Sequence, residues 1–330
     1  MRMPAIVATS SLLVLAVLAA TTAALAQAPQ PWPQRPVKLV VPFAAGGNID
    51  VMGRLAAARL SAAFRQQFIV ENRVGGNGSI AAQEVARAAP DGYTLLWAPT
   101  SVIATFPAIT KVNYDPVTSF APVSLFAVAP QMLVSNPKFP PQNVAEFVAY
   151  VNAQKEKLPY AGGGGPGSSS NLIMAIFLKR AGLEMTNVTY RGTAPAMSDL
   201  IAGHIPTMFV PISEALPQGR ANLIRMLAVS SRARSLEAPE VPTLAEQGFA
   251  DFHMVSWTGL MAPAKTPKEI VERMSAELAR ALKEPGLVEQ IRKAGNEPAH
   301  DASPAEFAAF IANEIALWGE AVKVAGVTLQ

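Results

Sequence analysis

The stretch VVPFAAGGNID, which spans Val40–Asp50, decides the class of fold. A β-branched run stops at Pro42, Phe43 and four small residues follow, and the chain then continues with the spacing of a helix. A strand that leads through such a turn into a helix N-terminus is a common anion-binding arrangement, because the first N–H groups of the helix have no partners. The stretch therefore predicts an α/β protein that holds an anion at this turn.

Strand-like and helix-like segments alternate along the rest of the chain. Apolar residues at helical spacing predict helices over residues 50–64, 79–89, 143–157, 171–182 and 196–203. Thr266 with Glu269, and Ser303 with Glu306, have the spacing of capping boxes and predict two helices near the C-terminus. Such alternation implies parallel-type sheets with helices on both faces, in which ligands lie beyond the carboxyl ends of strands.

The first 26 residues have the pattern of a secretory signal peptide. Arg2 supplies the positive charge, residues 12–20 the apolar run, and Ala24–Ala26 a small-residue cleavage site before Gln27. The apolar run is shorter than the ~20 residues that a membrane span needs. We therefore expect the chain to be exported and its leader, residues 1–26, to be removed.

The composition argues against several classes of function. The 330 residues contain no cysteine, which excludes disulfides, thiol catalysis and thiolate metal sites. Lys and Arg number 27 against 24 Asp and Glu, and the longest basic grouping, Arg232 and Arg234, is expected to be a solvated loop. Nucleic-acid binding requires a clustered basic face, so no nucleic-acid partner is expected.

Motifs of enzymes are incomplete in this chain. Residues 162–167 satisfy the spacing of a dinucleotide fingerprint, yet the next strand ends in Tyr190 and Arg191 instead of an acidic residue. A phosphate loop would need lysine at the position of Ser168. The three histidines share no metal-ligand spacing. The sequence thus indicates no catalytic residue, no metal and no cofactor, although an exported hydrolase or transferase with a spatially assembled Ser-His-Asp set stays open.

Six segments, taken together and in order, resemble a known family. They are residues 40–50, 69–96, 165–172, 189–203, 241–249 and 256–263, with sequences such as GPGSSSNL, TYRGTAPAMSDLIAG and VPTLAEQGF. The chain resembles the solute-binding proteins of tripartite tricarboxylate transporters, the Bug-type periplasmic receptors. The resemblance implies a monomeric periplasmic receptor that captures a small organic acid and delivers it to membrane permease subunits. A periplasmic sensor subunit with the same fold stays open beside transport.

The resemblance also implies an architecture, the two-domain periplasmic-binding-protein fold, a type II-like Venus flytrap. We expect residues 35–124 and 250–330 to form the first domain and residues 125–249 the second. The chain would then cross between the domains twice, which suits closure about a hinge around a ligand.

In the resemblance, four turns and one strand supply the ligand-binding residues. These are Phe43, Ala44, Ala45, Gly46, Gly47, Asn48, Asp50, Thr100, Ser101, Gly165, Gly167, Ser168, Ser169, Tyr190, Gly192, Thr193, Ala194 and Val210. Some of them also have a structural interpretation. Asp50 would cap its turn, Ser168 and Ser169 would be helix N-caps, and Tyr190 would pack at the end of a strand.

Three positions depart from the family pattern. Asn171 stands where many members have histidine, and Pro206 and Val210 stand where many have aspartate. An apolar Val210 facing the ligand would disfavour an amine or a hydroxyl-rich end, which leaves mono- and dicarboxylates, aromatic acids included. Residues 40–50 contain no lysine or arginine, and only Arg191 lies in a turn predicted to face the ligand. Main-chain N–H groups and helix dipoles are therefore expected to meet most of the ligand's charge.

Overall fold

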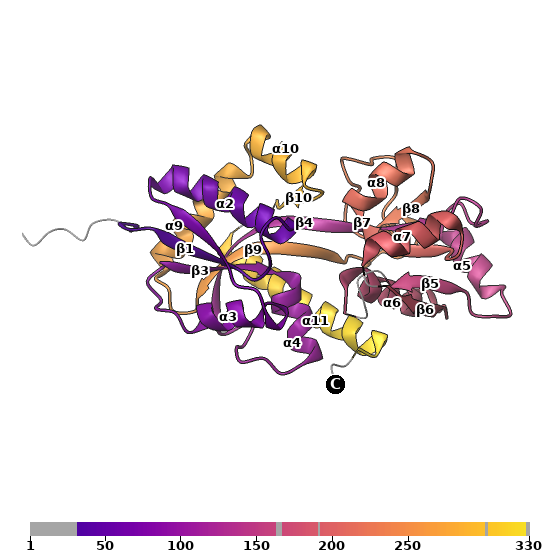
Figure 1. Cartoon of the computed structure of the whole chain (residues 1–330), viewed down its shortest axis with the longest axis horizontal. Coiled ribbons are helices and arrows are strands. Elements are labelled where there is room, and N and C mark those ends of the chain that lie inside the picture. The colour runs from indigo at the N-terminus through magenta and orange to yellow at the C-terminus, as the bar shows by residue number, and fades with distance from the viewer. Residues whose placement is uncertain (1–31, 163–166, 191, 301–302, 328–330) are drawn as a thin grey trace, which may run out of the picture.

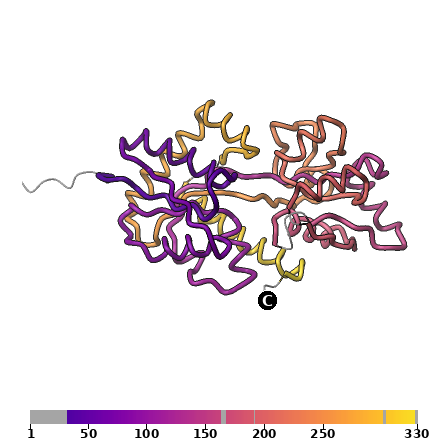
Figure 2. The backbone as a smooth tube through the Cα atoms, in the orientation of Figure 1, coloured from indigo at the N-terminus to yellow at the C-terminus, as the bar shows by residue number. Residues whose placement is uncertain are grey.

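The protein folds into two lobes joined by a narrow waist (Figure 1). The computed structural model describes residues 32–162, 167–190, 192–300 and 303–327. The predicted leader, residues 1–26, lies outside them. Figure 2 shows that few segments of the chain pass from one lobe to the other.

Within the described residues, ten strands are connected in one sheet that extends through both lobes. They are β1 (Val37–Val41), β2 (Phe68–Asn72), β3 (Thr94–Pro99), β4 (Phe120–Ser135), β5 (Pro159–Gly162), β6 (Thr186–Thr189), β7 (Thr207–Pro211), β8 (Arg225–Val229), β9 (Val255–Pro263) and β10 (Glu297–Pro298). The order is β2-β1-β3-β9-β4-β7-β5-β6, and both β8 and β10 pair with β4. The expected parallel pairing occurs in part of the sheet, between β1 and its neighbours β2 and β3, and between β5 and its neighbours β6 and β7. β4 is antiparallel to β7 and β8. β9 is antiparallel to β3 and β4.

Helices follow most of these strands. They are α2 (Asn48–Phe64), α3 (Ser79–Ala86), α4 (Phe106–Ile109), α5 (Val144–Asn152), α6 (Ser169–Ala181), α7 (Thr193–Ala202), α8 (Ile212–Arg220), α9 (Lys268–Ala281), α10 (Pro285–Lys293) and α11 (Pro304–Ala325). The capping box of Ser303 and Glu306 forms as predicted. The box predicted at Thr266 was wrong, since α9 begins at Lys268 and the Thr266 hydroxyl is buried without a hydrogen-bond partner. The N–H of Thr266 donates to Pro263 O, so this residue belongs to the preceding turn.

Three elements connect the lobes. β4 pairs with β9 along residues 120–130 in the first lobe and with β7 and β8 along residues 131–135 in the second. β9 returns the chain to the first lobe. α11 then extends from the core of the first lobe, at Phe307 and Ile311, to the core of the second lobe, at Trp318. The predicted division between residues 35–124 with 250–330 and residues 125–249 stays a prediction, but the end of α11 packs across it.

The core of the second lobe is built around α6. Nine consecutive residues of this helix, Ser170–Leu178, are buried. A helix that is apolar on all sides must be covered on all sides, and α6 contacts β5, β7 and the C-terminal helix α11. The helix is therefore anchored in the core of the second lobe.

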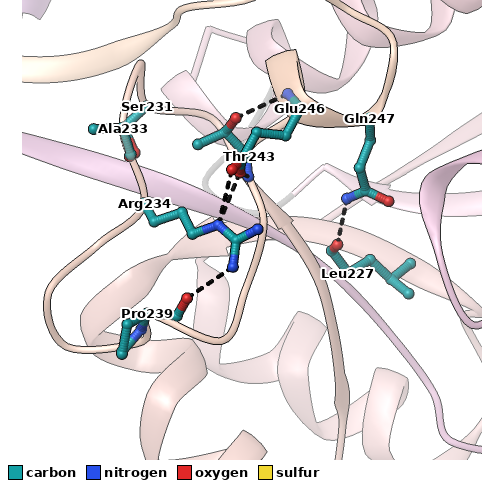
Figure 3. A network of polar contacts seen from close by, with 8 residues as sticks. All are labelled: Leu227, Ser231, Ala233, Arg234, Pro239, Thr243, Glu246 and Gln247. Atoms are coloured by element: carbon teal, nitrogen blue, oxygen red, sulfur yellow. Dashed lines mark hydrogen bonds and ion pairs between the residues drawn. The ribbon is translucent and has the colours of Figure 1, made fainter.

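A polar network holds the proline-rich loop that follows β8 (Figure 3). Arg234 Nε donates to both carboxylate oxygens of Glu246 at 3.0 and 2.9 Å, and its Nη1 donates to Pro239 O at 3.0 Å. Thr243 and Glu246 cap each other's backbone N–H groups at 2.7 and 3.0 Å. Gln247 Nε2 donates to Leu227 O at 2.8 Å and so ties the loop to β8. Arg234 lies at the surface as predicted, but its charge is paired rather than only solvated.

Candidate functional site

The turn after β1 presents main chain rather than side chains at the start of α2. Ala44, Ala45, Gly46 and Gly47 are all exposed. Gly46 adopts a left-handed φ of +84°, which glycine accommodates without strain. Gly47 is the N-cap of α2, and no side chain caps the helix there. The first N–H groups of α2, which have no partners within the helix, are thus left without a capping side chain.

Asp50 holds this turn in place. Its side chain is buried, and Oδ2 accepts hydrogen bonds from Gly46 N and Arg54 Nε, both at 2.8 Å. Oδ1 accepts from Asn72 Nδ2 at 2.8 Å, and the same amide donates to Phe43 O at 2.8 Å. Asp50 therefore caps the turn, which was the structural interpretation of this residue.

The negative charge of Asp50 is stabilised by the same contacts. Burial alone would raise the pKa of Asp50, but the hydrogen bonds from Arg54, Gly46 and Asn72 outweigh burial and lower this pKa below its ordinary value. Sequence reasoning missed Arg54. The signal was its position four residues after Asp50 on one helix, where opposite charges are neighbours.

A second turn, after β2, packs beside the first. Gly78 has a φ of +88°, and a Cβ there would lie 2.5 Å from Val102 Cγ2 and 3.0 Å from Pro42 Cβ. Pro42 follows β1 and Val102 follows β3. The turns after these three strands therefore meet at one edge of the first lobe, as the carboxyl ends of neighbouring parallel strands do.

Thr100 does not offer its hydroxyl to this edge, which corrects the prediction made for it. Its side chain is buried, and Oγ1 accepts from Trp257 N at 2.6 Å and donates to Trp257 O at 3.2 Å. The hydroxyl is used to tie the end of β3 to β9. Ser101, the first residue of the short π-helix η2 (Ser101–Thr105), is only half-buried, so of the two predicted residues it alone keeps part of its side chain exposed.

The N-terminus of α6 reaches from the second lobe to the first. Ser168 is its N-cap, and the hydroxyl accepts from the N–H three residues later at 3.3 Å. Ser169 Oγ accepts from Ser256 Oγ on β9 at 2.8 Å. A Cβ at Gly167 would lie 3.2 Å from Ile109 Cδ1 on α4. Ser256 is the neighbour of Trp257, the residue that Thr100 binds. The start of α6 and the turn after β3 therefore contact the same strand, β9.

The turn after β6 leads into α7 without a capping side chain. Gly192 is the N-cap of this helix with a φ of +145°, and Thr193 and Ala194 form its first turn. Tyr190 is half-buried, and its hydroxyl donates to Asp199 Oδ2 at 2.7 Å. Burial and the neighbouring carboxylate raise the pKa of Tyr190 to about 12. The Tyr190 hydroxyl therefore fastens the turn to α7, in keeping with its structural interpretation.

The remaining predicted residues divide in two. Gly165 and Arg191 lie outside the described residues. Val210 is described, and the prediction that it faces the ligand was wrong, because its side chain is completely buried in a cluster with Met132 and Val229. β7 has β4 on one side and β5 on the other, and this face of it packs against α7 and α8. The identity of residue 210 therefore says nothing about the polarity of a ligand.

Asn171, another departure from the family pattern, is also buried. Its Oδ1 accepts from Asn187 Nδ2 at 2.9 Å. A Cβ at Gly162 would lie 2.4 Å from Asn187 Oδ1 and 2.8 Å from Asn171 Oδ1, so the glycine makes room for this amide pair. The pair fixes the end of β5, from which the turn before α6 departs.

A buried carboxyl lies where the connecting elements meet. Glu314 on α11 is 3% exposed, and its Oε2 accepts from Trp257 Nε1 at 3.0 Å and from Trp318 Nε1 at 2.7 Å. Trp257 belongs to β9, and Trp318 belongs to the core of the second lobe. Burial raises the pKa of Glu314 to about 7, although the two indole hydrogen bonds act in the opposite direction.

The shifted pKa of Glu314 makes the stability of the protein depend on pH. Between the ordinary value of 4.5 and about 7, the folded state holds this proton more tightly than the unfolded state. The free energy of unfolding therefore falls as the pH rises through this window, by about 3 kcal/mol from this group. We expect Glu314→Gln, which keeps an acceptor oxygen for the indoles, to remove that part of the fall. Urea unfolding of both proteins at about pH 5 and about pH 8 measures it, and equal falls in the two would contradict the assignment.

In the described part of the chain, N–H groups and hydroxyls are the groups available to bind an anion. Among these residues, no cluster of three or more His, Cys, Asp or Glu side chains could hold a metal ion. None of the described helices is both long enough and apolar enough to cross a membrane.

Asn48, at the start of α2, donates from Nδ2 to Ala294 O at 2.7 Å, so its side chain is tied to the segment after α10.

Comparison with known proteins assigns the chain to a family. The model of the family described as tripartite tricarboxylate transporter family receptor matches residues 52–327. The chain belongs to this family. Its members are binding proteins and not enzymes, so the protein is a receptor, and the family is periplasmic.

Individual relatives agree with this assignment. BugT of Bordetella pertussis is 32% identical over 301 residues, which cover 91% of this chain and 92% of BugT. The structure of R. palustris Rpa4515 with adipate is 35% identical, with a TM-score of 0.72, and the match covers 90% of this chain and 99% of that one. MatC from Rhodopseudomonas palustris with bound malate is 32% identical, with a TM-score of 0.68, over 88% of this chain and 100% of that one. The Bug-type resemblance and the predicted two-domain binding-protein fold are confirmed.

Proposed function

We propose that the receptor captures a small carboxylate-containing molecule in the periplasm and delivers it to a membrane permease of the tripartite tricarboxylate type. One observation carries the proposal. The N-terminus of α6 from the second lobe contacts β9 through Ser169 and Ser256, beside the turn after β3 that Thr100 ties to the same strand. The helix N-terminus of α6 from the second lobe and the turn after β3 from the first lobe therefore lie against one connecting strand, which supports an anion site between the lobes.

In this proposal the main chain provides most of the binding. The N–H groups at the starts of α2, α6 and α7 would donate to ligand oxygens, with residues 44–48 and Ser101 on the first-lobe side of the ligand and Gly167–Ser169 and Gly192–Ala194 on the second-lobe side. Each helix N-terminus stabilises a carboxylate by ~0.3–1 kcal/mol, and by up to ~2 kcal/mol when the site is partly buried. Adipate in the Rpa4515 structure and malate in the MatC structure support a small organic acid as the ligand class.

The cellular setting is part of the same proposal. The pattern of residues 1–26 supports export with cleavage before Gln27, and the relatives support a periplasmic location. The mature receptor would act as a monomer and meet its permease partners at the membrane. N-terminal sequencing of the exported protein tests the cleavage site.

A ligand panel tests the ligand class. Binding to the folded state alone stabilises the receptor by RT ln(1 + [L]/Kd), or roughly 2.7 kcal/mol at a hundredfold excess over Kd. We expect adipate, malate or benzoate to raise the melting temperature, and glucose, primary amines, ATP and NAD to leave it unchanged. Thermal shift followed by calorimetry provides the measurement. A shift with NAD or ATP, and none with any acid, would contradict the proposed function.

A further inference from the structure

The end of α10 lies against the second lobe. Gly295 closes α10 in the usual way for a helix C-terminus, since its N–H donates to Arg292 O at 2.8 Å and the next N–H donates to Ile291 O at 3.1 Å. Its φ is +77°. This left-handed backbone conformation is the first reason why residue 295 is a glycine.

The second reason is a contact between the lobes. A Cβ on Gly295 would lie 2.1 Å from Ser213 Cβ and 2.6 Å from Ser213 Oγ. Ser213 belongs to the first turn of α8, in the second lobe. Real Cβ atoms do not approach other atoms so closely, so any side chain at residue 295 would push α8 away from α10.

The segment that touches α8 is also bound to the turn predicted to hold the ligand. Ala294 O accepts from Asn48 Nδ2 at 2.7 Å and from Asn296 Nδ2 at 3.0 Å. Asn48 is the first residue of α2, one of the helices whose N-terminus lacks a capping side chain. A continuous path of contacts therefore leads from the start of α2 through residues 294–295 to the start of α8.

We propose that Gly295 and Ser213 form the closing contact between the two lobes, and that the missing side chain at residue 295 lets α8 reach its position against the segment that is bound to Asn48. Gly295 and Ser213 are positioning residues in this account, and neither needs to touch the ligand. Their importance for affinity rests on the proposed function, whereas their importance for the approach of the lobes does not.

Cross-linking measures the approach of the lobes without any ligand. Arg220 on α8 and Lys293 on α10 line the same cavity of about 200 Å³ at this contact. The natural chain has no cysteine, so Arg220→Cys with Lys293→Cys gives one defined pair for a short bifunctional thiol reagent. The rate of cross-linking follows the population of closed molecules even when that population is small, because each closure is trapped.

Gly295→Ala in this double-cysteine background is expected to slow cross-linking by more than about tenfold, as an overpacked contact should. Adding Ser213→Gly removes the opposing side chain and is expected to restore the rate to within about twofold. Gly182→Ala is the matched control, because Gly182 ends α6 with the same pair of hydrogen bonds and a φ of +64° but has no atom within 4 Å of its Cβ position. This control should cross-link at the unmodified rate.

Each outcome decides the proposal. An unchanged rate in Gly295→Ala would overturn it, and so would a slowed rate that Ser213→Gly fails to restore, since the cause would then be backbone strain. Circular dichroism of every variant shows that it is folded. Calorimetry of the same Gly295 and Ser213 changes with adipate and malate separates the two proposals. Loss and recovery of cross-linking without binding of either acid by the unmodified protein would support the closing contact and count against the proposed function.

Discussion

Gly47→Val is expected to abolish binding of adipate or malate, whichever the receptor takes, while the protein stays folded. A branched side chain at this N-cap would occupy the space in which ligand oxygens approach the first N–H groups of α2. The fold should tolerate it, because a Cβ there meets only Ala44 O, at 3.6 Å, and the φ of −73° and ψ of 164° suit a β-branched residue. We expect affinity to fall more than about 100-fold, or about 2.7 kcal/mol, in calorimetry.

Two comparison variants make the Gly47→Val result specific. Gly286→Val changes another glycine near a helix start, on α10, where no atom lies within 4 Å, and it should bind as the unmodified receptor does. Arg191→Ala removes the one cation predicted in a ligand-facing turn and should cost less, about 1–2 kcal/mol, as one charge-assisted hydrogen bond in a wet site would. Loss of binding in Arg191→Ala with intact binding in Gly47→Val would show that a side-chain ion pair, not the main chain, recognises the ligand.

Asp50→Asn is expected to destabilise the protein and to weaken binding together. The amide would present a donor to a pocket that already contains the N–H of Gly46, Arg54 Nε and Asn72 Nδ2, and the charge that pairs with Arg54 would be lost. Removing one partner of a buried charged pair typically costs about 3–5 kcal/mol, and the half-exposed guanidinium of Arg54 places this pair at or below the lower end of that range. Urea unfolding and calorimetry measure the two effects.

The pH dependence of the same group has a definite sign. Because the pKa of Asp50 is below its ordinary value of 3.8 in the folded state, its contribution to stability is present above that value and is lost as the pH falls below it. Asp50→Asn should therefore flatten the acid side of the stability profile. Glu289→Gln breaks a comparable acid–base pair four residues apart on α10, but an exposed one, and should leave stability nearly unchanged. Equal effects of the two variants would contradict the positioning role of Asp50.

Several local features of the candidate site followed from neighbouring residues in the sequence. The turn at Gly46 and Gly47, the start of α2 and the N-cap at Ser168 were all predicted, because small residues before a helix and a serine at its first position act through the nearest backbone groups. The capping box at Ser303 formed for the same reason. The capping box at Thr266 did not form, because the N–H of Thr266 donates to Pro263 O and the residue belongs to the preceding turn.

The roles of individual side chains were less predictable. Thr100 and Val210 were expected near the ligand from the family resemblance, yet the hydroxyl of Thr100 binds the backbone of Trp257 and Val210 is buried. In both cases the partner lies far away in the sequence. A strand residue faces the core or the ligand according to which strands and helices cover it, and no local pattern specifies those neighbours.

The sequence by itself determined the α/β class, the small-residue turns at helix starts and the family, because each depends on residues close together or on several motifs in order. Only the tertiary structure decided what joins the lobes. The buried Glu314 between two indoles, the Ser169 bond to Ser256 and the contact of Gly295 with Ser213 each bring together residues from distant segments. Such contacts form only when helices and strands from distant segments pack together. Their energies depend on burial and distance, which cannot be read from the local sequence.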